Sequence, residues 1–274
     1  MKKLYALLLL AVIGFTPSLY ADRMVLVQGY LGSPSSWLKS GIVRVLSANG
    51  WQLGGEFNHG SDGVRLLTFN HPPPVSGNAF YTVNLPTEAP VHVQSYYLGS
   101  YLKQLRKDHP AESITLVGHS AGGVIARYTM VRVPGLDIER LITIASPHLG
   151  TDSARLGRLV GETPLTLIAP LVGAGTLNRS QGLYDDLLPA QPNRMLYWLN
   201  RQPHPEAEYI SIVRDQNSDL GGDWIVAQES QYLEKVAALR GRALSYVVPA
   251  THNLTRADGW LILDLVEERV LRPL

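Results

Sequence analysis

The architecture of this chain can be worked out from residues 114–123, which read ITLVGHSAGG. Residues 114–117 are apolar or β-branched and predict a buried strand. The run from Gly123 to Arg132 predicts a helix. Between them Gly118 and Gly122 flank Ser120 and leave room for a tight, strained turn. A strand, a tight turn and a helix in this order place a serine hydroxyl at the edge of a sheet.

Outward from this stretch, short apolar runs alternate with longer helical patterns. This alternation predicts an α/β fold with a mostly parallel central sheet flanked by helices. The 274 residues suit a single domain with an inserted cap. Expected strands are 24–27, 64–69, 81–85, 114–117, 141–145, 209–213 and 244–248, and expected helices are 36–48, 91–107, 122–132 and 258–271.

Residues 151–200 break this alternation. The segment contains apolar patches separated by glycine and proline, and no strand is expected in it. We therefore expect a helical cap inserted over the carboxyl edge of the sheet, where open α/β sheets place their ligands.

The N-terminal segment has the pattern of a targeting sequence. Lys2 and Lys3 precede an apolar run from Leu4 to Phe15, and a short polar stretch ends at Ala21. The run is shorter than the roughly 20 residues of a membrane-spanning helix. We expect residues 1–21 to be a cleaved signal peptide of a periplasmic or secreted bacterial protein, with a retained N-terminal anchor as the alternative.

Composition excludes several classes of function. The 24 basic and 23 acidic residues give a formal net charge of +1, which provides no broad positive field for nucleic acid. The absence of cysteine excludes a disulfide scaffold, a thiolate metal site and a thiol nucleophile. No metal-ligand set is evident. The run Asp215-x-Asn217-x-Asp219 departs from calcium-loop spacing, because Gly221 is seventh and Val226 is twelfth.

A serine nucleophile needs a base and a carboxylate, which in this architecture follow it in the order serine, acid, histidine. His252 lies in a loop directly after the last expected strand, so its ring is expected over the sheet edge as the base. His204 lies between two prolines and has no such placement.

The acid is expected in the loop after strand 209–213. Asp223 is favoured because Trp-Ile-Val follows it and would anchor the carboxylate. Asp219 is the alternative, and Asp152 ranks third.

Residues 25–32, VLVQGYLG, predict a strand that runs into a turn flanked by glycines. Such a turn can present a backbone N–H to a developing oxyanion. We assign the two expected donors to the backbone amides of Tyr30 and Ala121.

Together these features resemble the α/β-hydrolase superfamily, and within it the bacterial lipases and esterases with an inserted lid. The matching segments are residues 27–30, 118–122, 146–151, 185–200, 223–226 and 252–254. The resemblance implies ester hydrolysis through a covalent acyl-serine, without a cofactor. The family usually has histidine where this chain has Gln28, and His148 is expected to support the loop at the lid entrance.

The expected function is therefore a serine carboxylester hydrolase with Ser120, Asp223 and His252 as its triad, acting on lipophilic acyl esters. The expected partner is a small-molecule or lipid ester, and transient contact of the cap with a lipid interface is left open. Two alternatives remain: a thioesterase or acyltransferase with the same triad, and a non-catalytic binding protein of this fold.

Overall fold

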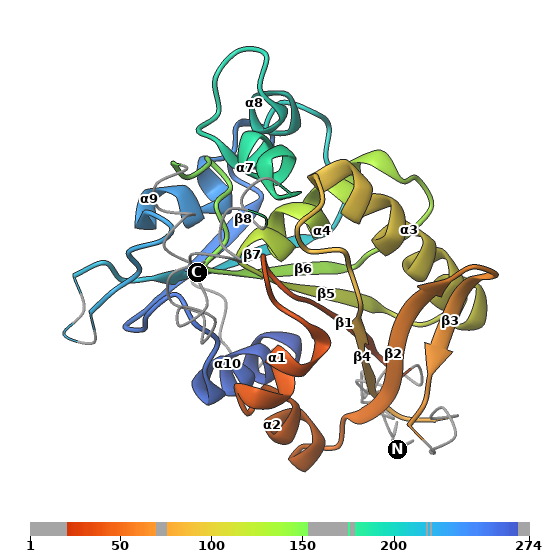
Figure 1. Cartoon of the computed structure of the whole chain (residues 1–274). Coiled ribbons are helices and arrows are strands. Elements are labelled where there is room, and N and C mark those ends of the chain that lie inside the picture. Colours follow the sequence, from red (N-terminus) through yellow and green to blue (C-terminus); the bar gives the residue numbers. More distant parts are fainter. Residues whose placement is uncertain are drawn as a thin grey trace, which may run out of the picture.

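The structure is a computed structural model that describes residues 21–69, 76–152, 175, 179–217, 219 and 221–267. An eight-stranded sheet crosses the described part of the chain in the order β3-β2-β4-β1-β5-β6-β7-β8 (Figure 1). Every neighbouring pair is parallel except β2 and β3. The strands are β1 (Arg23–Val27), β2 (Gln52–Gly60), β3 (Gly63–Leu67), β4 (Ala79–Val83), β5 (Ile114–His119), β6 (Arg140–Ile144), β7 (Glu208–Arg214) and β8 (Ala243–Val248).

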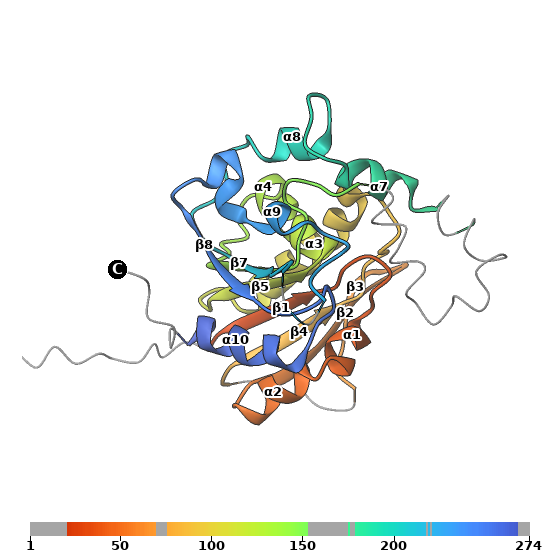
Figure 2. The ribbon, with the colours of Figure 1, turned by 90° about the vertical axis from the view of Figure 1, so that its left-hand side faces the viewer.

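Helices cover both faces of this sheet (Figure 2). One face packs against α1 (Pro34–Lys39), α2 (Ile42–Ala48) and α10 (Arg256–Val266), and the other against α3 (Val91–Asp108) and α4 (Ala121–Arg132). β1 shows why both faces are buried, because Val25 and Val27 belong to the core on the α3 side while Met24 and Leu26 belong to the core on the α10 side. A strand buried on two faces has a nearly continuous apolar sequence, which explains why apolar runs in the sequence predicted strands such as β1.

Short helices complete the described structure. They are α7 (Gln181–Leu187), α8 (Met195–Leu199), α9 (Gln228–Gln231), η2 (Leu233–Lys235) and η3 (Ala237–Leu239). In Figure 2, α7 and α8 lie beyond α3 and α4, on the side away from α10. Both belong to the segment expected to form the cap, in whose described residues no strand occurs.

The expected helix over 36–48 is two helices in the structure. The break falls at Gly41, whose φ of +87° lies in the left-handed region that glycine adopts at little cost. A second difference is β2, which we did not expect from the sequence. It carries glycines and polar residues, and its register shifts between Leu53 and Gly55, where φ is +139°.

Two expectations fall partly or wholly outside the described residues, namely the signal peptide at 1–21 and the apolar patches of the cap within 153–174. The last helix, expected over 258–271, ends earlier, at Val266, with Glu267 at its C-cap. None of the helices in the described ranges has the length and apolarity needed to cross a membrane.

The sheet determines where the site forms. β5, β6, β7 and β8 are consecutive parallel strands of the sheet, so their carboxyl ends lie at one edge. Ser120 follows β5, Asp223 lies in the connection after β7, and His252 lies in the connection after β8.

Candidate active site

Ser120 occupies a strained turn between β5 and α4. Its φ of 51° and ψ of −128° lie outside the regions that a residue with a side chain prefers. The turn is held by a hydrogen bond of 2.8 Å from the Ser120 amide to the carbonyl of Ile144. A Cβ atom on Gly122 would lie 2.4 Å from the carbonyl oxygen of Val27, so this close approach requires glycine.

Three sequence-predicted residues meet at this turn. The Ser120 hydroxyl lies 2.9 Å from His252 Nε2, and His252 Nδ1 lies 2.8 Å from Asp223 Oδ2. Ser120 and His252 are each 4% exposed, and Asp223 is 0% exposed. In a buried chain of this kind the imidazole can accept the hydroxyl proton while the carboxylate orients the ring.

Asp223 is held by its own loop. The amides of Ile225 and Val226 donate to Oδ1 at 2.9 Å each, and Gln231 Nε2 donates to Oδ2 at 3.1 Å. Burial alone would raise the pKa of Asp223, but the hydrogen bond and charge of His252 and the two amides outweigh it and lower the pKa below its ordinary value. The carboxylate that contacts the imidazole is thus Asp223, while Asp219 and Asp152 are exposed. The next residue, Trp224, is 62% exposed and lies in solvent.

His119 is a second histidine in the site, which the sequence analysis did not single out. Its Nε2 lies 2.9 Å from the carbonyl oxygen of His252, and the two rings are 5.2 Å apart. Burial and the neighbouring His252 lower the pKa of His119 to about 3. The ring is therefore neutral near pH 7, and Nε2 must carry the proton that it donates to the carbonyl.

Arg214, at the end of β7, ties the two loops to the sheet. Its guanidinium binds Asp258 at 2.7 and 2.9 Å and also donates to the carbonyl of Asn253 at 3.2 Å. Its backbone amide donates to Gln231 Oε1 at 2.8 Å, and Gln231 in turn donates to Asp223. The loops that carry the imidazole and the carboxylate thus share one buried anchor.

The turn after β1 lies directly against Ser120. A Cβ atom on Gly29 would come within 2.8 Å of Ser120 Cβ. Among the described residues, neither the Tyr30 amide nor the Ala121 amide has a hydrogen-bond acceptor. Two unpaired N–H groups are therefore present in the segments next to the hydroxyl.

In the turn after β1, the side chain of Tyr30 has a hydrogen-bond partner, whereas that of Gln28 has none among the described residues. The Tyr30 hydroxyl lies 2.7 Å from that of Tyr184 on α7, and the rings are 5.4 Å apart in an edge-to-face arrangement. Gln28 is buried, and its amide has no partner in the described part of the chain. The turn is instead closed by a 3.0 Å hydrogen bond from the Gly32 amide to the Gly29 carbonyl.

Other titratable residues considered from sequence lie elsewhere. His148 Nε2 contacts Thr143 Oγ1 at 3.0 Å, and His204 Nδ1 donates to the carbonyl of Gln202 at 2.8 Å. Asp215 accepts a hydrogen bond from the Asn217 amide at 2.9 Å, as in a simple turn. No group of three histidine, aspartate or glutamate side chains suited to a metal ion occurs within the described ranges.

Comparisons with known proteins agree with this architecture. Residues 87–156 match the family described as PGAP1-like alpha/beta domain. A triacylglycerol lipase of Pseudarthrobacter phenanthrenivorans is 33% identical over 79 residues, which are 29% of this chain and 24% of that lipase. The matched region is thus about a quarter of the lipase's length.

Two solved structures share the fold over most of this chain. A gene product of Listeria innocua is superimposed with a TM-score of 0.58 at 14% identity, over 90% of this chain and 94% of its own. The lipase BlEst2 of Bacillus licheniformis, in its propeptide form, gives a TM-score of 0.55 at 15% identity, over 90% of this chain and 50% of its own.

The chain therefore has the fold of the α/β hydrolases, and it is similar to lipases and esterases. The predicted fold class and the predicted family resemblance are both confirmed.

Proposed function

We propose that this α/β hydrolase is a serine carboxylester hydrolase that acts on lipophilic acyl esters through an acyl-serine intermediate. The observation that carries the proposal is the buried chain of hydrogen bonds from Ser120 through His252 to Asp223.

In the proposed reaction, His252 Nε2 takes the proton of Ser120 Oγ while Oγ attacks the ester carbonyl carbon. Asp223 keeps the ring oriented and stabilises the imidazolium that forms. The amides of Tyr30 and Ala121 donate to the oxyanion of the tetrahedral intermediate. His252 then protonates the leaving alcohol, and a water molecule repeats the sequence on the acyl-serine to release the acid and restore Ser120.

A lipophilic acyl group is supported by the surroundings of the site. The described part of the expected cap is apolar toward the domain, where Leu183 and Leu187 of α7 are buried. Tyr30 of the proposed oxyanion turn packs against Tyr184 of the same helix. The partially matching relative is named a triacylglycerol lipase, which is consistent with such a substrate. The segment at 1–21 supports a periplasmic or secreted location, where external esters are available.

Labelling with a fluorophosphonate probe tests the nucleophile. The wild-type protein is expected to be modified at Ser120, and the Ser120→Ala variant is expected to remain unlabelled while keeping the same circular dichroism spectrum. Failure of the folded wild-type protein to react would contradict the proposal and favour a non-catalytic binding protein.

A second experiment tests the substrate. We expect p-nitrophenyl esters of increasing acyl length to be hydrolysed with a rising kcat/KM, measured with and without an emulsified triglyceride. Faster cleavage of matched thioesters would indicate a thioesterase, and dominant transfer to an added alcohol would indicate an acyltransferase. A preference for acetyl over longer acyl groups would contradict the lipophilic assignment.

A further inference from the structure

A buried cation on α4 lies outside the proposed catalytic machinery. The side chain of Arg127 is 0% exposed. Its Nη2 donates to Asn200 Oδ1 at 2.7 Å, whereas Nε and Nη1 have no hydrogen-bond partner among the described residues. A buried guanidinium with most of its donors unused needs an acceptor that the described protein groups do not supply.

The other buried arginines show what Arg127 lacks. Each of them lies beside a carboxylate, and the pairs are Arg23 with Glu112 at 2.6 Å, Arg140 with Glu208 at 2.6 Å and Arg214 with Asp258 at 2.7 Å. No carboxylate of the described chain forms an ion pair with Arg127. An isolated charge in a protein interior is strongly unfavourable unless it is neutralised. Burial accordingly lowers the pKa of Arg127 to about 9.

A buried histidine is joined to Arg127 through Asn200. Asn200, which accepts from Arg127, donates to the carbonyl of His148 at 3.0 Å. His148 Nδ1 is buried and unpartnered within the described ranges. We call Arg127, His148 and Asn200 the Arg127 cluster.

We propose that the Arg127 cluster binds a small monovalent inorganic anion of the chloride type. The anion would accept hydrogen bonds from Nε and Nη1 of Arg127 and supply the missing counter-charge. Water alone would satisfy the donors but leave the charge unbalanced. A metal ion would be repelled by the guanidinium, and a large anion would not reach a group that is fully buried.

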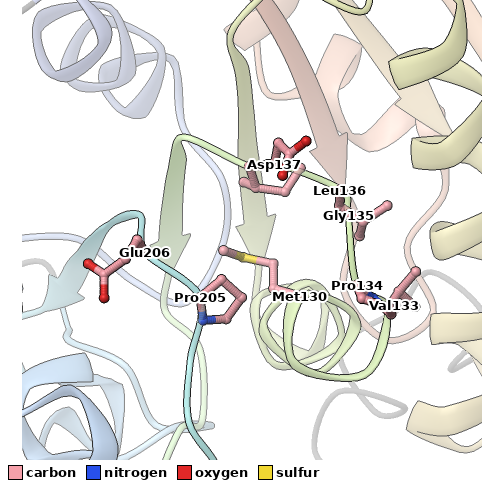
Figure 3. A pocket seen from close by; sticks show the side chains of 9 residues that line it. Met130, Val133, Pro134, Gly135, Leu136, Asp137, Pro205 and Glu206 are labelled. Atoms are coloured by element: carbon pink, nitrogen blue, oxygen red, sulfur yellow. The ribbon is translucent and has the colours of Figure 1, made fainter.

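The location of the cluster is distinct from that of the triad. His148 and Asn200 lie close to the two ends of the segment expected to form the cap, so the anion would sit where that segment leaves and rejoins the domain. A pocket of about 240 Å³ lies farther along α4, with Met130, Asp137, Pro205 and Glu206 in its lining (Figure 3). Its two carboxylates would disfavour an anion, so the proposed site is the buried cluster and not this pocket.

Thermal unfolding at constant ionic strength tests the proposal. Replacing gluconate by chloride or bromide is expected to raise Tm with a saturating dependence, by roughly 5–10 °C when the halide exceeds its Kd 100-fold. Arg127→Gln, which keeps hydrogen-bonding capacity but removes the charge, is expected to abolish the dependence. Arg140→Met removes a buried arginine that already has a carboxylate, and it is expected to keep the dependence.

Crystallography of the wild-type protein provides a test that does not depend on the stability of a variant. Crystals soaked in bromide are expected to show an anomalous peak within about 3.5 Å of Arg127 Nε or Nη1. Water density without an anomalous signal at this place would overturn the proposal. A Tm of the wild-type protein that is independent of halide, or an equal halide effect on Arg127→Gln, would also overturn it.

Discussion

At the scale of single residues, the loop after β7 carries two aspartates in very different environments. Asp223 is fully buried and accepts hydrogen bonds from His252, Gln231 and two amides, whereas Asp219 is exposed. Asp223→Asn is expected to lower kcat on a p-nitrophenyl ester by about 10³- to 10⁴-fold, because the amide would favour the wrong tautomer of the imidazole. Asp219→Asn is the matched control and is expected to leave kcat within about twofold. Equal losses in the two variants would contradict the assignment of the acid.

His119 is expected to act as a positioning residue for His252. His119→Leu removes the hydrogen bond to the carbonyl of His252, so we expect kcat to fall roughly 10- to 100-fold because the imidazole is misplaced, while KM changes little. His119→Gln keeps an N–H donor and is expected to recover most of the loss. Urea unfolding of both variants separates this effect from a loss of stability, and a rate for His119→Leu equal to wild type would refute the role.

The residues that sequence reasoning identified share a local signal. Ser120 lies in a G-x-S-x-G turn, and Asp223 and His252 each follow an apolar run that predicts a strand. His119 gives no such signal, because its partner is a carbonyl 133 positions away along the chain. Arg214 was missed for the same reason, since its contact with Asp258 spans 44 positions.

At the scale of elements, the connection from β8 to α10 depends on a buried ion pair. Arg214 and Asp258 are almost fully buried, and Asp258 also completes the capping box of α10 with Thr255. Arg214→Met is expected to lower the free energy of unfolding by about 3–5 kcal/mol, because it leaves a buried carboxylate unpaired.

An exposed ion pair provides the control for this experiment. Arg65 binds Asp62 on the β2–β3 hairpin, and both side chains are more than half exposed. Arg65→Met is expected to leave the free energy of unfolding almost unchanged in the same urea titration, because solvent screens an exposed ion pair. Losses of similar size in the two variants would show that the Arg214 pair does not act as an anchor.

The elements that sequence predicted well are those buried on both faces. β1 and β5 are mostly apolar, and their apolar residues divide between two cores. β2 could not be recognised, because Gly54 and Gly55 interrupt its pattern and a register shift disturbs its alternation. Gly54 is required by packing that the sequence does not reveal, since a Cβ atom there would lie 2.3 Å from the ring of Tyr81.

At the scale of the whole molecule, buried histidines make stability depend on pH. Burial lowers the pKa of His204 to about 4 and that of His119 to about 3, and it lowers the pKa of His148 well below its ordinary value. The unfolded chain takes up these protons near pH 6.5, whereas the folded protein does not until the pH is much lower. Stability is therefore expected to fall as the pH drops from about 6.5 towards 4.

His204 offers a direct measure of this effect. Below pH 6.5, each such histidine lowers the free energy of unfolding by up to about 1.4 kcal/mol for every pH unit of acidification. His204→Gln is therefore expected to reduce the slope of the free energy of unfolding against pH by up to this amount. Urea unfolding at pH 7, 6 and 5 measures the slope. Asp223 acts at lower pH, because its depressed pKa adds stability above its ordinary pKa of 3.8 that is lost only as the pH falls further. A wild-type stability that is constant from pH 7 to pH 5 would refute the prediction.

At this scale too, features set by local sequence could be predicted, whereas features set by contacts between distant residues could not. The α/β-hydrolase fold follows from the order of apolar runs and helical patterns, and the structure confirms it. The location of the protein and its ester substrate stay predictions. The Arg127 cluster was not foreseen, because Arg127, His148 and Asn200 come together only when α4 packs against both ends of the 151–200 segment.

The exposure of Trp224 gives this protein a built-in optical reporter. The indole stands in water next to Asp223, while Trp37 and Trp51 are enclosed by the core. Its emission lies at longer wavelength than theirs and is open to collisional quenchers such as acrylamide. In a Trp260→Phe background, which removes a second exposed indole, a micelle or ester that covers Trp224 would shift the emission of Trp224 to the blue and shield it from quenching, so arrival at the site can be followed without an attached dye.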